Sequence, residues 1–239
     1  MNITTFPSRP RTVLPLAGVI AAVSAALALA FSGGHTALGH EHATKHADGH
    51  AHAVKHKTLT SKQLAFHDGM RKLWEDHITW TRLAIVSFAA GLPDFDATAG
   101  RLLENQEDIG DAIKPYYGKR ADDQLTALLK EHIAGAVDLL KAAKAGDDAK
   151  FAQVKDAWYR NGDEIARFLS DANPKYWKFG KVSALMRGHL DQTLEEAAAR
   201  LKGDFAADIR AYDEIHHHIL RMADTLSSGI IKQFPKQFR

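Results

Sequence analysis

Three histidines stand in the same local pattern along the part of the chain that follows residue 57. His77, His132 and His189 each come four residues after a leucine and four residues before a threonine or alanine. In a helix these positions share one face, which predicts that each imidazole is buried with space beside its ring. Buried neutral imidazoles bind transition metals and form hydrogen bonds with polar molecules, so this pattern indicates a binding site.

A second set of polar residues follows each histidine at a matching distance. A glycine comes fourteen residues after each histidine, at positions 91, 146 and 203. Fourteen or fifteen residues after these glycines come Asn105, Asn161 and His218. Since fourteen helical residues rise about 21 Å, a helix that ends at the glycine and one that returns from it bring both polar residues to the same height. The spacing therefore predicts one mid-height layer of four histidines and two asparagines.

The residue types in this layer favour a divalent transition metal, Zn²⁺ or Cu²⁺, or a small polar ligand. The candidate metal ligands are His77, His132, His189 and His218. Asn105 and Asn161 are poor ligands for these ions, and they suit hydrogen bonding to an imidazole or to a bound molecule. Haem held by two facing histidines stays open as a further cofactor.

Three carboxylates lie close to the predicted layer in sequence. Asp108 and Glu164 come three residues after the two asparagines, and Asp213 comes five residues before the last histidine of the layer. They are expected either to orient the imidazoles or to face solvent. His216 and His217 stay ambiguous, because the apolar stripe of their segment is broad.

Three functions use the same layer. Leaving a buried polar group unsatisfied costs about 1–3 kcal/mol, so a layer of six such groups favours ligand or metal binding over stability alone. The second function is a metal- or haem-dependent oxidoreductase, and the third is a purely structural or adaptor bundle whose polar groups only fix the helix register. A ferritin-like dimetal oxidase is excluded, because Glu214-x-x-His217 is the only Glu-x-x-His match in this domain.

The elements that must position these residues are helices. Candidate N-caps such as Ser61, Asp122 and Asp204 precede helical patterns, and glycines follow them. No segment shows the alternation of a strand bounded by hairpin turns. The predicted helices cover residues 61–90, 97–116, 122–145, 148–171, 181–202 and 204–228, and Gly229 is expected to end the last one. The predicted fold is all-α, a six-helix bundle built from three repeated α-hairpins.

Two segments precede this domain. Residues 1–31 carry Arg9, Arg11 and no acid, then an uncharged run from Val13 to Phe31 with a small-x-small site at 28–30. This pattern predicts an exported protein (secreted, periplasmic or extracytoplasmic) that has either a cleaved signal peptide or a membrane anchor. Residues 32–57 contain seven histidines without apolar periodicity, which is typical of a disordered linker and favours loose metal capture. Residues 58–239 form the predicted helical domain.

The composition excludes several classes of protein. The chain of 239 residues has no cysteine, so disulfides, thiolate metal sites and cysteine nucleophiles are excluded. The formal net charge is +2, and Arg9 and Arg11 account for it, because the remaining 29 basic residues match the 29 acidic ones. A neutral chain with interspersed charges is not expected to bind nucleic acid.

Several strings resemble, as a set, a bacterial family of small all-helical proteins without an established activity. They include Asn161 with Asp163-Glu164-Ile165-Ala166, the string from His218 to Asp224 with Ile-Leu and Met-Ala inside it, and Ile230-Ile-Lys-Gln-Phe-Pro235. The resemblance covers about residues 68–238 and omits the histidine-rich segment. It implies an all-helical domain and leaves the function open.

Overall fold

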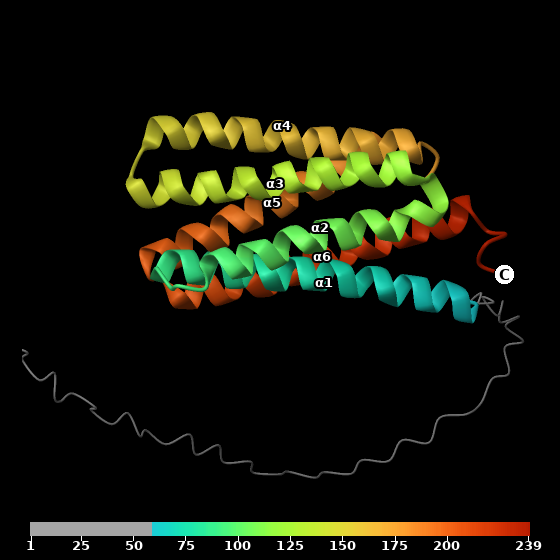
Figure 1. Cartoon of the computed structure of the whole chain (residues 1–239), viewed down its shortest axis with the longest axis horizontal. Helices are drawn as coiled ribbons and strands as arrows, with labels where there is room; N and C mark the ends of the chain where they lie inside the picture. Colours follow the sequence, from blue (N-terminus) through green and yellow to red (C-terminus); the bar gives the residue numbers. More distant parts are fainter. Residues whose placement is uncertain (1–58) are drawn as a thin grey trace, which may run out of the picture. The chain divides into compact units, whose positions relative to one another are not determined.

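A computed structural model describes residues 59–239, which form a bundle of six helices that run alternately up and down (Figure 1). The helices are α1 (Ser61–Ala90), α2 (Phe95–Tyr117), α3 (Lys119–Ala145), α4 (Asp148–Ala172), α5 (Phe179–Lys202) and α6 (Phe205–Gln233). The described residues contain no strand. The predicted all-α fold is confirmed for this part of the chain, and most predicted helix boundaries lie within a few residues of the observed ones.

Each helix packs against the next one along the chain, and α6 packs against α1, so the six helices form a closed ring. Contacts also join α1, α3 and α5 to one another across the interior. The connections after α1, α3 and α5 lie together at one end of the bundle (Figure 1). This arrangement turns one face of each of these three helices toward a common centre.

The connections at that end depend on glycine. Gly91, Gly146 and Gly203 have φ angles of +66°, +67° and +76°, in the left-handed region that glycine adopts without strain. The side chains of Asp147 and Asp204 then accept hydrogen bonds from the first turns of α4 and α6. The chain therefore reverses sharply after each of the three helices.

Two of the predicted capping residues have other positions. Thr60, and not Ser61, caps α1, and its side chain forms a reciprocal capping box with Gln63. Asp122 is buried inside α3, where Lys114 lies 3.2 Å from its carboxylate. Both differences follow from the side-chain partners that the fold provides.

The prediction that Gly229 ends the last helix is wrong, because α6 continues to Gln233. Gly229 is buried inside α6, and a Cβ at this position would lie 1.9 Å from Nε1 of Trp177. The indole of Trp177 is 1% exposed and donates a hydrogen bond to the carbonyl of Thr225. Gly229 thus permits the close approach of a tryptophan and does not form a turn.

No helix within residues 59–239 is both long enough and apolar enough to cross a lipid bilayer. The two predicted N-terminal segments, residues 1–31 and 32–57, lie outside the described residues.

We expect Gly229→Ala to lower the free energy of unfolding by about 1–3 kcal/mol, since the added methyl group must displace the Trp177 indole from a packed core. Gly69→Ala is the matched control, because a Cβ there meets no atom within 4 Å and Gly69 is exposed on α1. Alanine in an open helix position should raise stability by about 0.5–1 kcal/mol. Denaturant unfolding measures both changes, and equal effects in the two variants would contradict the packing explanation.

Candidate functional site

Three equivalent hydrogen bonds tie the outer helices to the inner ones at mid-height. Asn105 Nδ2 donates to the carbonyl of Leu73 over 3.0 Å, and Asn161 Nδ2 donates to the carbonyl of Leu128 over 3.1 Å. In the third helix pair, His218 Nε2 takes the same role and donates to the carbonyl of Leu185 over 2.8 Å. Each acceptor stands four residues before the histidine of its helix. The structure therefore brings the six predicted residues together as three side-by-side pairs, which we call the polar layer.

The three histidines of α1, α3 and α5 meet in the centre of the bundle. The ring centroid of His189 lies 5.6 Å from that of His77 and 5.9 Å from that of His132. All three side chains are buried, with 2–3% of their surface exposed. His189 thus lies between the other two rings.

Side-chain amides hold two of these rings. His132 Nδ1 lies 3.1 Å from Oδ1 of Asn161, and because an amide oxygen only accepts, Nδ1 of His132 must carry the proton. His77 Nδ1 lies 3.3 Å from Nε2 of Gln106, and this amide nitrogen also donates to the carbonyl of Leu102 over 2.7 Å. Gln106 was not among the site residues predicted from the sequence. Its signal was its place between Leu102 and Ile109 on the apolar stripe of α2.

His189 is the central histidine whose ring forms no hydrogen bond within residues 59–239. Nδ1 of His189 is buried and forms no hydrogen bond within residues 59–239, and the same holds for Oε1 of Gln106. Buried polar atoms without partners are rare in proteins, so His189 is the least satisfied member of the polar layer.

Burial keeps the three central imidazoles neutral. Desolvation, with repulsion from His132 as a second cause, lowers the pKa of His77 to about 3. Desolvation likewise lowers the pKa of His132 to about 4, although the hydrogen bond with Asn161 opposes this shift. The pKa of His189 lies well below its ordinary value for the same reason, with the other histidines adding to the effect. The centre of the bundle is therefore polar but uncharged at neutral pH.

The candidate carboxylates lie away from this layer. Asp108 is exposed and pairs with Arg101, Glu164 is exposed on α4, and Asp213 is exposed on α6. The two ambiguous histidines also point elsewhere, because His216 lies 3.0 Å from Glu75 and His217 Nδ1 donates to the carbonyl of Asp213. None of these five residues joins the polar layer.

Within residues 59–239, no group of three or more histidine, aspartate or glutamate side chains is arranged to hold a metal ion. Two of the central rings direct Nδ1 to amides, and Nδ1 of His189 is buried without a partner in the described part of the chain. Zinc or copper at His77, His132, His189 and His218 stays a prediction, as does haem.

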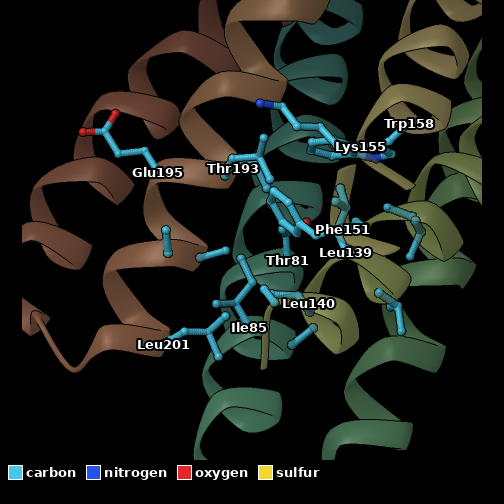
Figure 2. A pocket seen from close by; sticks show the side chains of 18 of the residues that line it. Thr81, Ile85, Leu139, Leu140, Phe151, Lys155, Trp158, Thr193, Glu195 and Leu201 are labelled. Carbon is cyan, nitrogen blue, oxygen red and sulfur yellow. The ribbon is translucent and has the colours of Figure 1, made fainter. Parts of the chain in front are cut away.

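A cavity of about 330 Å³ lies between the polar layer and the end of the bundle where Gly91, Gly146 and Gly203 form the turns. It begins at Thr81, Ala136 and Thr193, the small residues one helical turn beyond the three central histidines. Its walls come from α1 to α5 and are almost entirely alanine, leucine, isoleucine, valine, phenylalanine and tryptophan (Figure 2).

Three side chains connect the cavity to the polar layer. Trp158 lines the cavity, stacks on His132 at a centroid distance of 5.0 Å, and donates to the carbonyl of His132. Thr81 and Thr193 also line it, and each hydroxyl donates to the carbonyl of the histidine one turn before it over 2.8 Å. A molecule in the cavity would therefore touch the groups that pack directly on the layer.

A second buried polar cluster joins α1, α5 and α6. Arg82 donates to Glu196 and to Asp208 over 2.7 Å each, and Arg200 adds a contact of 3.2 Å with Asp208. Both carboxylates are fully buried. Burial, with the nearby Asp208 charge and despite Arg82, raises the pKa of Glu196 to about 7. This network was not predicted from the sequence, because its members come from three distant segments.

Comparisons of the chain with models of protein families, with curated proteins and with solved structures found no match. The family resemblance noted in the sequence stays a prediction.

The unequal satisfaction of the central histidines predicts unequal effects of replacing them. His132→Leu leaves Oδ1 of Asn161 without its donor, whereas His189→Leu removes a ring whose Nδ1 has no protein partner. We expect His132→Leu to be less stable than His189→Leu by about 1–3 kcal/mol. Denaturant unfolding of both variants measures the difference, and equal stabilities would show that the Asn161 contact contributes nothing.

The lowered pKa values predict that the bundle loses stability in acid. Below about pH 6.5 the imidazoles of the unfolded chain take up protons, while His77 and His132 stay neutral until about pH 3 and 4. The free energy of unfolding should fall as pH falls from 6.5 to about 4.5, by about 1.4 kcal/mol per pH unit for each such histidine.

Glu196 acts in the opposite direction, because its raised pKa makes the folded state take up a proton first. The His189→Leu variant separates the two contributions, since it removes one buried imidazole and leaves Glu196 unchanged. Its unfolding free energy should fall less steeply with pH than that of the original protein. The same slope in both proteins would contradict a buried neutral His189.

Proposed function

We propose that the domain is a small-molecule-binding bundle and that its ligand occupies the cavity between the polar layer and the three glycine turns. The observation that carries this proposal is the cavity itself. Its volume of about 330 Å³ is at the lower end of the range, roughly 300–1,000 Å³, of small-molecule sites in proteins. Side chains in a core normally close such a space, since packing is otherwise dense.

The lining specifies the chemistry of the ligand. Apolar walls favour an apolar body, because burying it removes its surface from water. The hydroxyl protons of Thr81 and Thr193 are already donated to helix carbonyls, so these side chains offer only lone pairs to a ligand. The proposed ligand is therefore mostly apolar, in place of the small polar ligand expected from the sequence.

The polar layer has a supporting role in this proposal. Its neutral rings place no charge at the inner end of an apolar site, and Trp158 connects the cavity wall to His132. The oxidoreductase and the purely structural bundle are the alternatives that use the same layer. Binding of an apolar probe in the cavity distinguishes ligand binding from the structural alternative.

Three further parts of the proposal rest on the sequence. We propose that residues 1–31 direct export or anchor the chain, and that residues 32–57 capture Zn²⁺ or Cu²⁺ near the domain. We also propose that the bundle consists of three repeats of one α-hairpin. The equivalent hydrogen bonds of Asn105, Asn161 and His218 support the repeat.

We expect the uncharged fluorescent probe N-phenyl-1-naphthylamine to bind the protein, and Ala136→Phe to weaken this binding about tenfold or more, because the added ring fills the cavity. Ala134→Phe is the matched control, since Ala134 is exposed on the same helix and does not line the cavity. Fluorescence titration measures both affinities, with thermal unfolding as a check that the variants are folded. Binding that Ala136→Phe leaves unchanged would favour the structural alternative.

A further inference from the structure

One cation stands at the opening of the cavity. Lys155 lines the cavity from α4, one turn before Trp158, and is otherwise exposed. Its side chain runs from α4 toward the side of the cavity on which Thr193 lies (Figure 2). A lysine in this position buries its methylene stem against apolar surface and keeps its ammonium group near water.

The charge of Lys155 is not neutralised by the described part of the chain. No carboxylate within residues 59–239 forms an ion pair with Lys155, and its ammonium lies 5.7 Å from the ring centroid of Tyr159. Lys141 and Lys144 at the same end of α3 are engaged, by Asp138 and by the carbonyl of Phe88 respectively. Lys155 is thus the available cation among these three.

Two acidic residues lie near this opening, and neither pairs with Lys155. Glu195 also lines the cavity, but its carboxylate points away from it (Figure 2). Asp191, one turn earlier on α5, accepts a hydrogen bond from the hydroxyl of Tyr159. Lys155 therefore supplies the positive charge at the opening.

The inner end of the cavity is unfavourable for an anionic group. Thr81 and Thr193 offer only hydrogen-bond acceptors there, and the three neutral histidines beyond them carry no charge. The two threonines that line that end would give an anionic group no donor in exchange for its lost hydration. A ligand with an apolar chain and an acidic head has one favourable orientation, with its head at Lys155.

We propose that the cavity binds a single-chain amphiphile with an anionic head, of the alkyl carboxylate class. Lys155 pairs with the head group, and the alkyl chain lies in the cavity that helices α1 to α5 line. This inference rests on the proposed function, because it names the class of ligand for the same cavity. It adds a specificity-determining residue that contacts the ligand at the rim.

The test is calorimetric titration of the full chain with decanoate, decanol and decylamine, which share one alkyl chain and differ in the charge of the head. Lys155→Met keeps the apolar stem and removes the charge. We expect it to weaken decanoate binding about fivefold, the effect of losing one partly exposed ion pair, and to leave decanol binding unchanged. Added salt should weaken the binding of decanoate and not that of decanol.

Two control variants fix the meaning of the result. Lys150→Met removes a charge from an exposed position of α4 that does not line the cavity, and it should leave all three affinities unchanged. Ala136→Phe should weaken decanoate and decanol alike, which assigns both to the cavity.

The outcomes separate the two proposals. If decanol and decanoate both bind, and Lys155→Met leaves the affinity for decanoate unchanged, the role of Lys155 is overturned. The proposed function then stays in place. Tighter binding of decylamine than of decanoate would overturn the anionic head group. The absence of binding by all three amphiphiles, together with no binding of the naphthylamine probe, would overturn both proposals.

Discussion

The height of each outer helix beside its inner neighbour depends on one interaction, the hydrogen bond from a side chain at mid-height to a main-chain carbonyl. Asn105, Asn161 and His218 each donate to the carbonyl four residues before the central histidine of the paired helix. An amide or imidazole N–H in a core must find an acceptor, so a slip of the helix would separate this N–H from the carbonyl that it bonds. Apolar packing alone tolerates such a slip better, because it is not directional.

This constraint also explains why a cavity stands beside the polar layer. With the three pairs fixed in height, the residues one turn beyond the histidines all come to one level, and there the chain has Thr81, Ala136 and Thr193. Small side chains on three converging helices leave space that larger ones would fill. Trp158 approaches from α4 next to Gly135, where a Cβ would lie 2.9 Å from its ring, and so becomes the wall between layer and cavity. The layer and the cavity are therefore consequences of the same repeated pattern.

The buried polar groups divide into two kinds with different effects on stability. The central histidines stay neutral and cost stability in acid, because the unfolded chain binds protons that the bundle does not. The cluster of Arg82, Glu196 and Asp208 keeps charge in the core through paired contacts. Removing one partner of such a cluster lowers stability by more than the intact cluster adds, because a buried charge is then left unpaired. Both kinds tie helices that are distant in sequence, and both favour a single arrangement of the bundle.

The sequence by itself determined the helices, their up-and-down order and the common height of the six polar residues. These follow from helical rise, from glycine turns and from apolar periodicity, which are local properties of the chain. Only the tertiary structure decided which polar groups meet. It placed Gln106 beside His77, left Nδ1 of His189 without a partner, and sent Asp108, Glu164 and Asp213 to the surface. It also showed that Gly229 receives Trp177 instead of ending a helix. The reason is physical: the rotation of each helix about its axis, and the space between helices, depend on the side chains of all its neighbours at once.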